Sequence, residues 1–160
     1  MEITSPAFEN GGSIPREYTR DGDNKSPPIR ISDVPKFAQS LVLILDDPDS
    51  KRGTFTHWVI FNLDPQLSLI DEARIPKHAR QGANGYGESR YSGPTPTAFE
   101  HRYIFKLVAL NSRLDLSTGA SRMEVEKAMR GRVIATAQLM GRYAMEKVES
   151  TDFVSSDSGT

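Results

Sequence analysis

One short stretch brings together the carboxylates and the histidine whose types and spacing could bind a small charged ligand. Asp47 and Asp49 follow the apolar run 41–45, and His57 comes a few residues later. A short, continuous apolar run is typical of a strand buried on both faces, and Pro48 should end that strand because proline cannot donate to a β-ladder. We therefore expect both carboxylates at the mouth of a strand, where they could hold the His57 imidazole at a pocket rim.

Two stretches of alternating sequence each begin their apolar row near a histidine. Side chains two positions apart lie on the same face of a strand, so the alternation predicts one strand over 55–63 and another over 101–110. The second histidine, His101, follows a loop rich in glycine and proline. The expected rows are Phe55, His57, Val59, Phe61 and Leu63 in the first strand, and His101, Tyr103, Phe105, Leu107 and Ala109 in the second.

Two aspartates and two histidines leave several kinds of site open. One histidine in an apolar row is more often a core residue that has found a hydrogen-bond partner, but two histidines beside two carboxylates favour a binding site. A metal site would use the same residue types, yet the sequence has no helical His-x-x-x-His spacing and no cysteine pair. A Ser-His-Asp hydrolase lacks its Gly-x-Ser-x-Gly elbow. We expect no metal, no cofactor and no catalytic residues.

Composition narrows the class of protein further. The 160 residues are of a length typical of a single domain, and a net charge of −1 gives no global attraction for nucleic acid. There are no cysteines, which rules out disulfides and a thiol nucleophile. No basic-then-apolar leader and no run of about eighteen apolar residues occurs. These features predict a cytoplasmic protein without a membrane span.

The remaining segments predict few helices. Glycines and prolines recur throughout residues 1–36, which favours turns between short extended segments. Ser121 and Glu124 form a capping-box pattern ahead of a helix over 121–130, with Gly131 as its stop. Residues 133–143 fit either a helix or a strand. The stretch 149–160 is rich in Ser, Asp and Thr and predicts a disordered tail behind a domain of residues 1–148.

Several spaced motifs resemble those of the phosphatidylethanolamine-binding protein family, and of its bacterial Raf kinase inhibitor-like branch in particular. They are Asp47-Pro48-Asp49, His57-Trp58, Gly93-Pro94-Thr95-Pro96 and His101-Arg102-Tyr103, with Ser5-Pro6-Ala7-Phe8 and Ser26-Pro27-Pro28 before them. The resemblance implies a mainly β fold, an antiparallel sandwich of two sheets with one or two short helices. It also implies that residues 133–143 form a strand.

Matched residue by residue, the pocket of that family falls on Asp47, Asp49, His57, Gly93, Pro94, His101 and Tyr103. Imidazoles, the tyrosine hydroxyl and backbone N–H groups near Gly93 are donors suited to a phosphate-like oxyanion. The two carboxylates must then either orient the imidazoles or meet a cationic part of the ligand. Four departures from the family pattern alter the rim: Lys51, Thr95, Thr97 and Phe99.

The resemblance favours binding over catalysis. We expect a pocket for a phosphate or phosphoethanolamine-type headgroup, with a modest preference for the zwitterion, in a protein that regulates a protein partner. The alternative is an inhibitor-like interaction module that docks on a kinase or protease. A less favoured alternative is an enzyme with Asp49 and His57 as an acid/base pair. Expected partners are a phosphate-containing ligand or phospholipid headgroup, a protein, and a second copy in a homodimer, but not nucleic acid.

Overall fold

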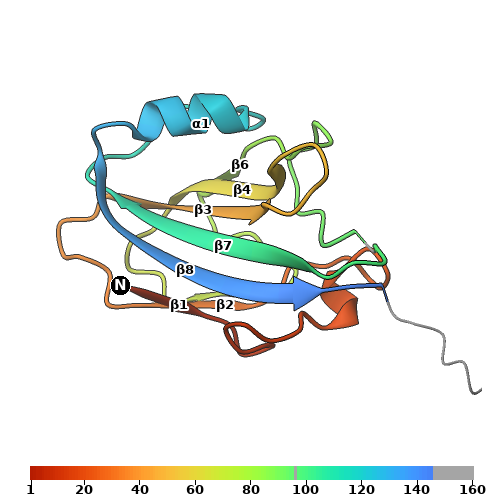
Figure 1. Ribbon diagram of the computed structural model, residues 1–160. Helices are drawn as coiled ribbons and strands as arrows, with labels where there is room; N and C mark the ends of the chain where they lie inside the picture. The colour runs from red at the N-terminus through yellow and green to blue at the C-terminus, as the bar shows by residue number, and fades with distance from the viewer. Residues whose placement is uncertain (96, 146–160) are drawn as a thin grey trace, which may run out of the picture.

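Two antiparallel sheets and one helix make up the fold in the computed structural model, which describes residues 1–95 and 97–145. The smaller sheet has the order β1-β2-β5 and the larger one β6-β4-β3-β7-β8 (Figure 1). The strands are β1 (Glu2–Thr4), β2 (Ile29–Ser32), β3 (Ser40–Asp47), β4 (Phe55–Leu63), β5 (Leu69–Ile70), β6 (Arg80–Gln81), β7 (His101–Leu110) and β8 (Val133–Tyr143). Among the described residues α1 (Arg122–Met129) is the one α-helix, and a short 3-10 turn spans Arg16–Tyr18.

The predicted β-sandwich is confirmed, and so are its four long strands. Residues 133–143, ambiguous by pattern alone, form β8, which pairs along β7 from His101↔Tyr143 to Leu110↔Val133. The segment forms a strand rather than a helix because a strand can bury Leu139 in the core between the sheets while its opposite face stays exposed. Hydrogen-bonded pairing with a long neighbour outweighs the helix propensity of its alanines.

Two apolar cores lie on the two faces of the large sheet. Alternate residues of β3 divide between them: Leu41, Leu43 and Leu45 face the smaller sheet, and Val42 and Ile44 face α1. Burial on both faces explains why this strand reads as a continuous apolar run. The expected row of β7, from Tyr103 to Ala109, lies in the core between the sheets as predicted.

The expected row of β4 is wrong, because the strand is irregular at two points. Leu45 pairs with Trp58 but Asp46 pairs with Thr56, so His57 is an extra residue in β4. Such a β-bulge turns the side chains that follow to the other face. Trp58 and Ile60 therefore enter the core between the sheets, whereas Val59 and Phe61 pack under α1. A second irregularity near Asn62, at φ 57°, returns Leu63 to the first core.

The predicted helix and its cap are confirmed. The hydroxyl of Ser121 accepts a bond from the N–H of Glu124, and the Glu124 carboxylate accepts one from the N–H of Ser121. This reciprocal capping box satisfies two N–H groups that the first turn would otherwise leave without partners. Val125 and Met129 bury their side chains against the large sheet, and Gly131 turns the chain at φ 75°.

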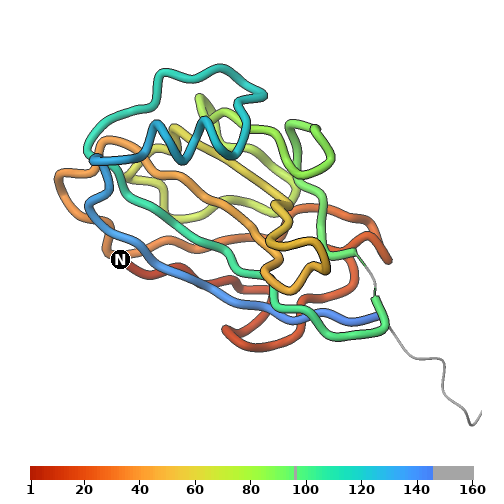
Figure 2. The backbone as a smooth tube through the Cα atoms, turned by 45° about the horizontal axis from the view of Figure 1, so that its top comes forward, coloured from red at the N-terminus to blue at the C-terminus, as the bar shows by residue number. Residues whose placement is uncertain are grey.

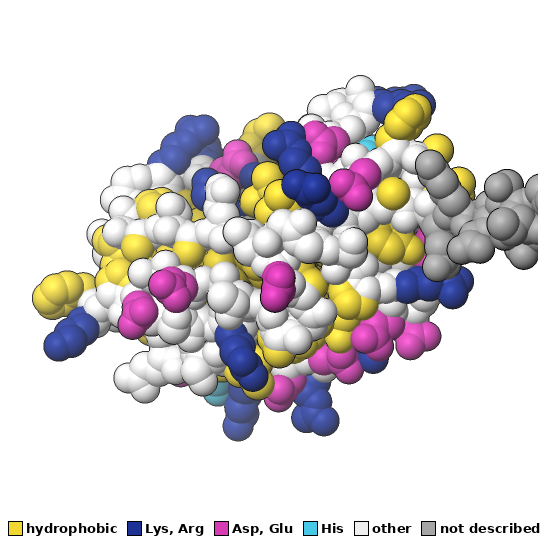
Figure 3. Space-filling view, turned by 60° about the horizontal axis from the view of Figure 1, so that its bottom comes forward, with side chains coloured by type: hydrophobic (Ala, Val, Ile, Leu, Met, Phe, Trp, Pro, Cys, Tyr) yellow, Lys and Arg dark blue, Asp and Glu magenta, His cyan; other side chains and the backbone are white. Residues whose placement is uncertain are grey.

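The loop from Asp47 to Phe55 and the segment that leads into His101 lie at the same end of the sandwich, as Figure 2 shows. Acidic and basic side chains are interspersed on the face seen in Figure 3, in keeping with the near-neutral net charge. Across the described ranges, no helix combines the length and apolar character that a bilayer crossing needs. The predicted disordered tail, residues 149–160, lies outside the described residues.

Candidate functional site

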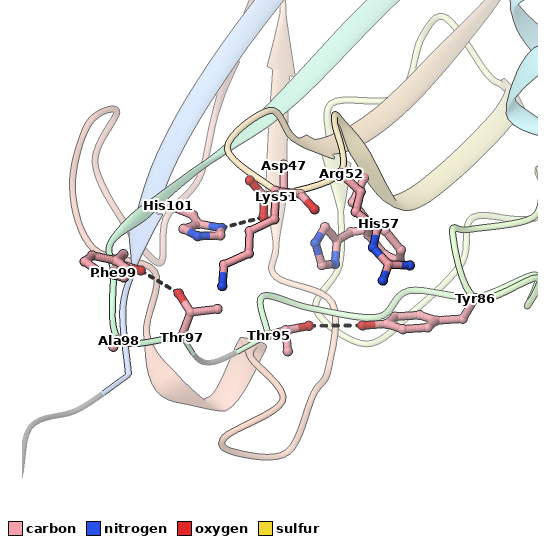
Figure 4. A pocket seen from close by; sticks show the side chains of 12 residues that line it. Asp47, Lys51, Arg52, His57, Tyr86, Thr95, Thr97, Ala98, Phe99 and His101 are labelled. Carbon is pink, nitrogen blue, oxygen red and sulfur yellow. Dashed lines mark hydrogen bonds and ion pairs between the residues drawn. The ribbon is translucent and has the colours of Figure 1, made fainter.

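A cavity of about 520 Å³ opens at that end of the sandwich. Its walls come from the end of β3, the following loop, the start of β4, the start of β7 and the segment before β7 (Figure 4). The lining residues are Asp47, Ser50, Lys51, Arg52, Phe55, His57, Tyr86, Thr95, Thr97, Ala98, Phe99 and His101. The structure thus brings both predicted histidines and one of the predicted aspartates to one cavity.

His57 is a buried, neutral imidazole whose proton position is fixed by the backbone. Its side chain is placed by the bulge in β4, and its Nδ1 lies 2.7 Å from the carbonyl oxygen of Ser92. Because a carbonyl only accepts, Nδ1 carries the proton and Nε2 keeps the lone pair. Burial lowers the pKa of His57 below its ordinary 6.5, against opposing contributions from Ser92, Asp47 and Asp46. The neutral ring therefore offers the cavity an acceptor at neutral pH.

His101 is held by a carboxylate instead. Its Nδ1 lies 2.7 Å from Oδ2 of Asp47, whose other oxygen, Oδ1, accepts the N–H of Asp49 at 2.8 Å. Both oxygens of Asp47 are thus engaged, and the side chain fixes the ring orientation of His101. Of the two roles open to the carboxylates, Asp47 takes the first, which is to orient an imidazole.

Asp49 has a different partner and is not among the residues that line the cavity. Its Oδ2 accepts bonds from the backbone N–H and Nε of Arg102, and its Oδ1 accepts one from Nη2 at 2.8 Å. These bonds to Arg102 hold the pKa of the Asp49 carboxyl down at about 2. Arg102 thus forms an ion pair with Asp49. The pairing of Asp49 with His57 as acid and base is not supported, since each is bonded to another group.

The third carboxylate of the cluster belongs to the helix side of the sheet. Asp46 accepts bonds from Arg122 Nη1 at 2.6 Å and from the hydroxyl of Thr56 at 2.9 Å. Three aspartates close in sequence therefore bond to basic side chains of two elements, Asp46 to α1 and both Asp47 and Asp49 to β7. Within residues 1–95 and 97–145, no three His, Asp or Glu side chains are gathered so that they could hold a metal ion.

Gly93 and Pro94 are buried and do not line the cavity. The Gly93 N–H donates to Oδ1 of Asn24 at 2.7 Å, so it is not the free oxyanion donor that was expected. A Cβ at Gly93 would lie 2.1 Å from the carbonyl oxygen of Tyr18, which explains the need for glycine. The carbonyl of Pro94 accepts the N–H of Arg20. Both residues fasten the loop before β7 to the N-terminal segment.

Tyr103 is buried between the two histidines. Its ring meets that of His57 edge-on at a centroid distance of 5.5 Å and stacks on that of His101 at 6.3 Å. Burial raises the pKa of its hydroxyl, with Asp47 and Asp49 adding to the effect, so the group stays protonated. Tyr103 thus packs against both imidazoles as a core residue and is not among the residues that line the cavity.

Two cationic side chains at the cavity change the expected balance of charge. Lys51 and Arg52 both line it from the loop after β3, and in the view of Figure 4 the Lys51 chain extends between the two imidazoles. Lys51 was predicted to alter the rim, but Arg52 was not singled out. Phe55 and the half-exposed Tyr86 supply aromatic wall. The only sequence signal for Arg52 is its position beside Lys51 in the loop that follows the aspartates.

Comparison with known proteins decides the family. A family model described as phosphatidylethanolamine-binding protein matches residues 4–144. The chain belongs to the phosphatidylethanolamine-binding protein family. It is 45% identical over 148 residues to a UPF0098 protein of Methanothermobacter thermautotrophicus, covering 89% of this chain and 98% of that one. The predicted family resemblance is confirmed.

Solved structures agree with this phosphatidylethanolamine-binding protein fold. A homologue of the family from Chlamydia trachomatis superposes with a TM-score of 0.86 at 41% identity, covering 91% of this chain and 97% of that one. A carboxypeptidase Y inhibitor, solved in complex with its cognate proteinase, shares the fold at a TM-score of 0.57 and 15% identity, covering 91% and 83%. The matched range includes every residue placed at the cavity.

Proposed function

We propose that the cavity binds a small anion of the phosphate monoester type, such as a phospholipid headgroup or a free phosphate ester. The observation that carries this proposal is that two cations, Lys51 and Arg52, line one cavity together with His57 and His101, and the neutral His57 ring can accept the proton of a phosphate monoanion. Cationic donors bind phosphate oxygens through charge-assisted hydrogen bonds, which are about twice as strong as neutral ones. The aromatic wall accommodates an organic substituent on the phosphate.

The anionic end of the ligand, rather than its ammonium, dominates this proposal. Asp49 is neutralised by Arg102, and both oxygens of Asp47 already accept bonds. An ammonium group would have to compete for Asp47 with His101. The modest preference for phosphoethanolamine expected from the sequence therefore shrinks, and we expect phosphoethanolamine and phosphate to bind within a few-fold of each other.

Calorimetric titration of both ligands tests the proposal. Lys51→Met should weaken phosphate binding several-fold, because one partly solvated charge pair contributes on the order of 1 kcal/mol. Lys77→Met removes the same charge from an exposed position outside this cavity and is the matched control. Equal effects of both variants, or no binding of either ligand by the wild type, would contradict an anion site here.

A second candidate is an inhibitor-like module that docks on a protein partner around the cavity. The supporting observation is the exposed aromatic rim, where Phe99 is 74% and Tyr86 44% exposed. The fold shared with a carboxypeptidase Y inhibitor makes a protease a reasonable first partner to test. A pull-down with wild type and Phe99→Ser distinguishes the candidates, since a docking role predicts loss of capture while phosphate affinity stays.

We propose binding without turnover, in a cytoplasmic protein. His57 and His101 are each held by a different neighbour, and no step of covalent chemistry is needed to explain either contact. Hydrolysis of a phosphate ester by the purified protein, lost in His57→Ala, would overturn the first statement. Cell fractionation would test the second.

A further inference from the structure

Asp46, Thr56 and Arg122 form a polar cluster on the side of the large sheet that α1 covers (Figure 1). Nη1 of Arg122 donates to Oδ1 of Asp46 at 2.6 Å and to the hydroxyl of Thr56 at 2.8 Å. The Thr56 hydroxyl in turn donates to Oδ1 of Asp46 at 2.9 Å. Three bonds among three side chains therefore join β3, β4 and α1 at one point.

The cluster lies at the bulge that places His57. Asp46 of β3 pairs with Thr56 of β4, whereas the preceding residue, Leu45, pairs with Trp58. His57 is the extra residue between these two pairs. Backbone groups are alike at every position of a strand, so side chains must decide where such a register change occurs. The bonds of Arg122 to Asp46 and Thr56 fix the pair on one side of the bulge.

Thr56 lies between two residues that line the anion cavity. Phe55 and His57 both line it, and their rings meet edge-on at a centroid distance of 5.0 Å. The buried Thr56 side chain instead meets Arg122 of α1. Because consecutive side chains of a strand point to opposite faces, a bond that holds Thr56 towards α1 also holds Phe55 and His57 towards the cavity.

A second restraint on His57 comes from the loop before β7 and has a different effect. The ring Nδ1 lies 2.7 Å from the carbonyl oxygen of Ser92, and the N–H of Ser92 donates to the carbonyl of His57 at 3.1 Å. These contacts set the tautomer and the orientation of the ring. The position of the backbone beneath the ring depends on the cluster at Thr56.

Arg122 is held in place by the helix that carries it. Its Nη2 pairs with Glu126 one turn later at 2.9 Å, and its side chain is 28% exposed. Within the part of the chain that the structure describes, its Nε is buried and has no hydrogen-bond partner, which is unfavourable for the fold. A guanidinium can bond in two directions at once, whereas a lysine ammonium is a single point of charge.

We propose that Arg122 is a positioning residue of the anion cavity, acting from α1 through Asp46 and Thr56 on the bulge that presents His57. The inference rests on the anion-binding function proposed above and adds a residue that is not among those lining the cavity. Without Arg122 the bulge is fixed on one side only, so Phe55 and His57 take up a wider range of positions and bind the ligand less well. The helix thereby takes part in binding from the opposite face of the sheet.

Calorimetric titration of phosphate against the full chain is the first test. Arg122→Gln should weaken binding at least about threefold, an effect within the range of residues that touch no ligand. Arg122→Lys keeps the charge but not the two-way bonding and should recover only part of the affinity. Lys127→Gln removes the same charge from an exposed position of α1 outside the cavity and should change nothing. Equal effects of Arg122→Gln and Lys127→Gln overturn the proposal.

Two further variants separate positioning from charge and from stability. Thr56→Val removes two bonds of the cluster without any change of charge, and it should weaken phosphate binding as Arg122→Gln does. Met129→Ala removes a buried side chain of α1 outside the cluster, and it should leave the affinity of the folded protein unchanged. Full affinity in Thr56→Val, or equal weakening by Met129→Ala and Arg122→Gln, overturns the proposal.

A measurement without ligand keeps this inference apart from the anion-binding function itself. In the NMR spectrum of the free protein, the Nδ1–H of His57 should exchange slowly with water because it is bonded to Ser92. Arg122→Gln should shift this signal and speed its exchange, and Lys127→Gln should not. Absence of phosphate binding by the wild type would contradict the anion site alone. A His57 signal identical in wild type and Arg122→Gln would overturn the positioning role.

Discussion

At the scale of single residues, the two imidazoles of the cavity are made chemically different by their neighbours. His57 donates to a backbone carbonyl and is buried, whereas His101 faces the carboxylate of Asp47. A carbonyl fixes one tautomer of a neutral ring, and a carboxylate can partner either a neutral or a charged ring. Two histidines that look equivalent in the sequence thus present unlike groups to one cavity.

His57 should make stability depend on pH in a defined direction. Its folded-state pKa is lowered by burial, so the unfolded chain binds its proton more readily. The neutral His57 ring therefore makes its full contribution to the free energy of unfolding above the ordinary pKa of 6.5. This contribution is lost as pH falls from 6.5 towards the lower pKa that His57 has in the folded protein. Urea unfolding of wild type and His57→Gln between pH 7 and pH 5 should show a steeper loss in the wild type.

A bound anion should reverse part of this effect, because a negative charge beside the ring favours its protonated form. Sulfate, which does not titrate in this range, should raise the pKa of His57 measured by NMR, and its affinity should weaken as pH rises through the bound-state value. A His57 resonance that saturating sulfate leaves unmoved would identify the ring as part of the core only.

At the scale of elements, the loop after β3 is fastened to β7 by one ion pair. Asp49 bonds to the backbone and guanidinium of Arg102 at the start of β7, and Lys51 lies two positions further along the same loop. The Asx-type bond from the N–H of Asp49 to Asp47 tightens the same turn. The ion pair of Asp49 with Arg102, called the clamp below, therefore fixes the position of Lys51 and Arg52 at the cavity.

Asp49→Asn should loosen this clamp. A bidentate surface ion pair contributes about 1 kcal/mol to the free energy of unfolding, so we expect a loss of that order at pH 7 together with weaker phosphate binding. The pKa of Asp49 is about 2 in the folded protein and 3.8 ordinarily. The ionised Asp49 carboxylate therefore makes its full contribution to stability above pH 3.8, and this contribution disappears as pH falls towards 2. The difference between the two proteins should vanish over that range.

Asp71→Asn, in an exposed loop position, is a suitable control and should change neither quantity. Chemical denaturation and calorimetry measure both effects. Full stability together with a changed ratio of phosphoethanolamine to phosphate binding would show that Asp49 meets the ligand directly instead of acting through Arg102.

At the scale of the whole molecule, the core lies between residues 3 and 139. Two clusters on the faces of the large sheet contain its buried apolar side chains, from Ile3 in β1 to Leu139 in β8. Charges of both signs are interspersed on the face in Figure 3. The predicted absence of nucleic-acid binding stays a prediction that follows from the net charge of −1.

Removal of residues 149–160 should leave the melting temperature nearly unchanged. Phe153 and Val154 are the only large apolar residues of this stretch, too few to offset the entropy of ordering it. Thermal unfolding of a chain ended after Val148, beside the full chain, measures the effect. A drop of several degrees would mean that these two side chains dock on the sheets.

The sequence by itself determined the elements and the family. Alternation with period two located β7, and a continuous apolar run located β3, because side-chain direction along a strand follows from local geometry alone. Ser121 and Glu124 marked the start of α1 because capping is also local. The motifs around His57 and His101 carried the family, and with it the identity of β8 as a strand.

Only the tertiary structure decided which groups meet. The extra residue at His57 moved Trp58 into the core between the sheets, because a bulge changes the count on which alternation depends. Asp47 bonds to His101 and Asp49 bonds to Arg102, and each partner is more than fifty positions away in the sequence. Distances of that kind are set by how β3 and β7 pair, and no local pattern contains them. The same pairing carries the loop after β3, with Lys51, to the cavity, where a cation stands beside a cluster that reads as acidic in the sequence.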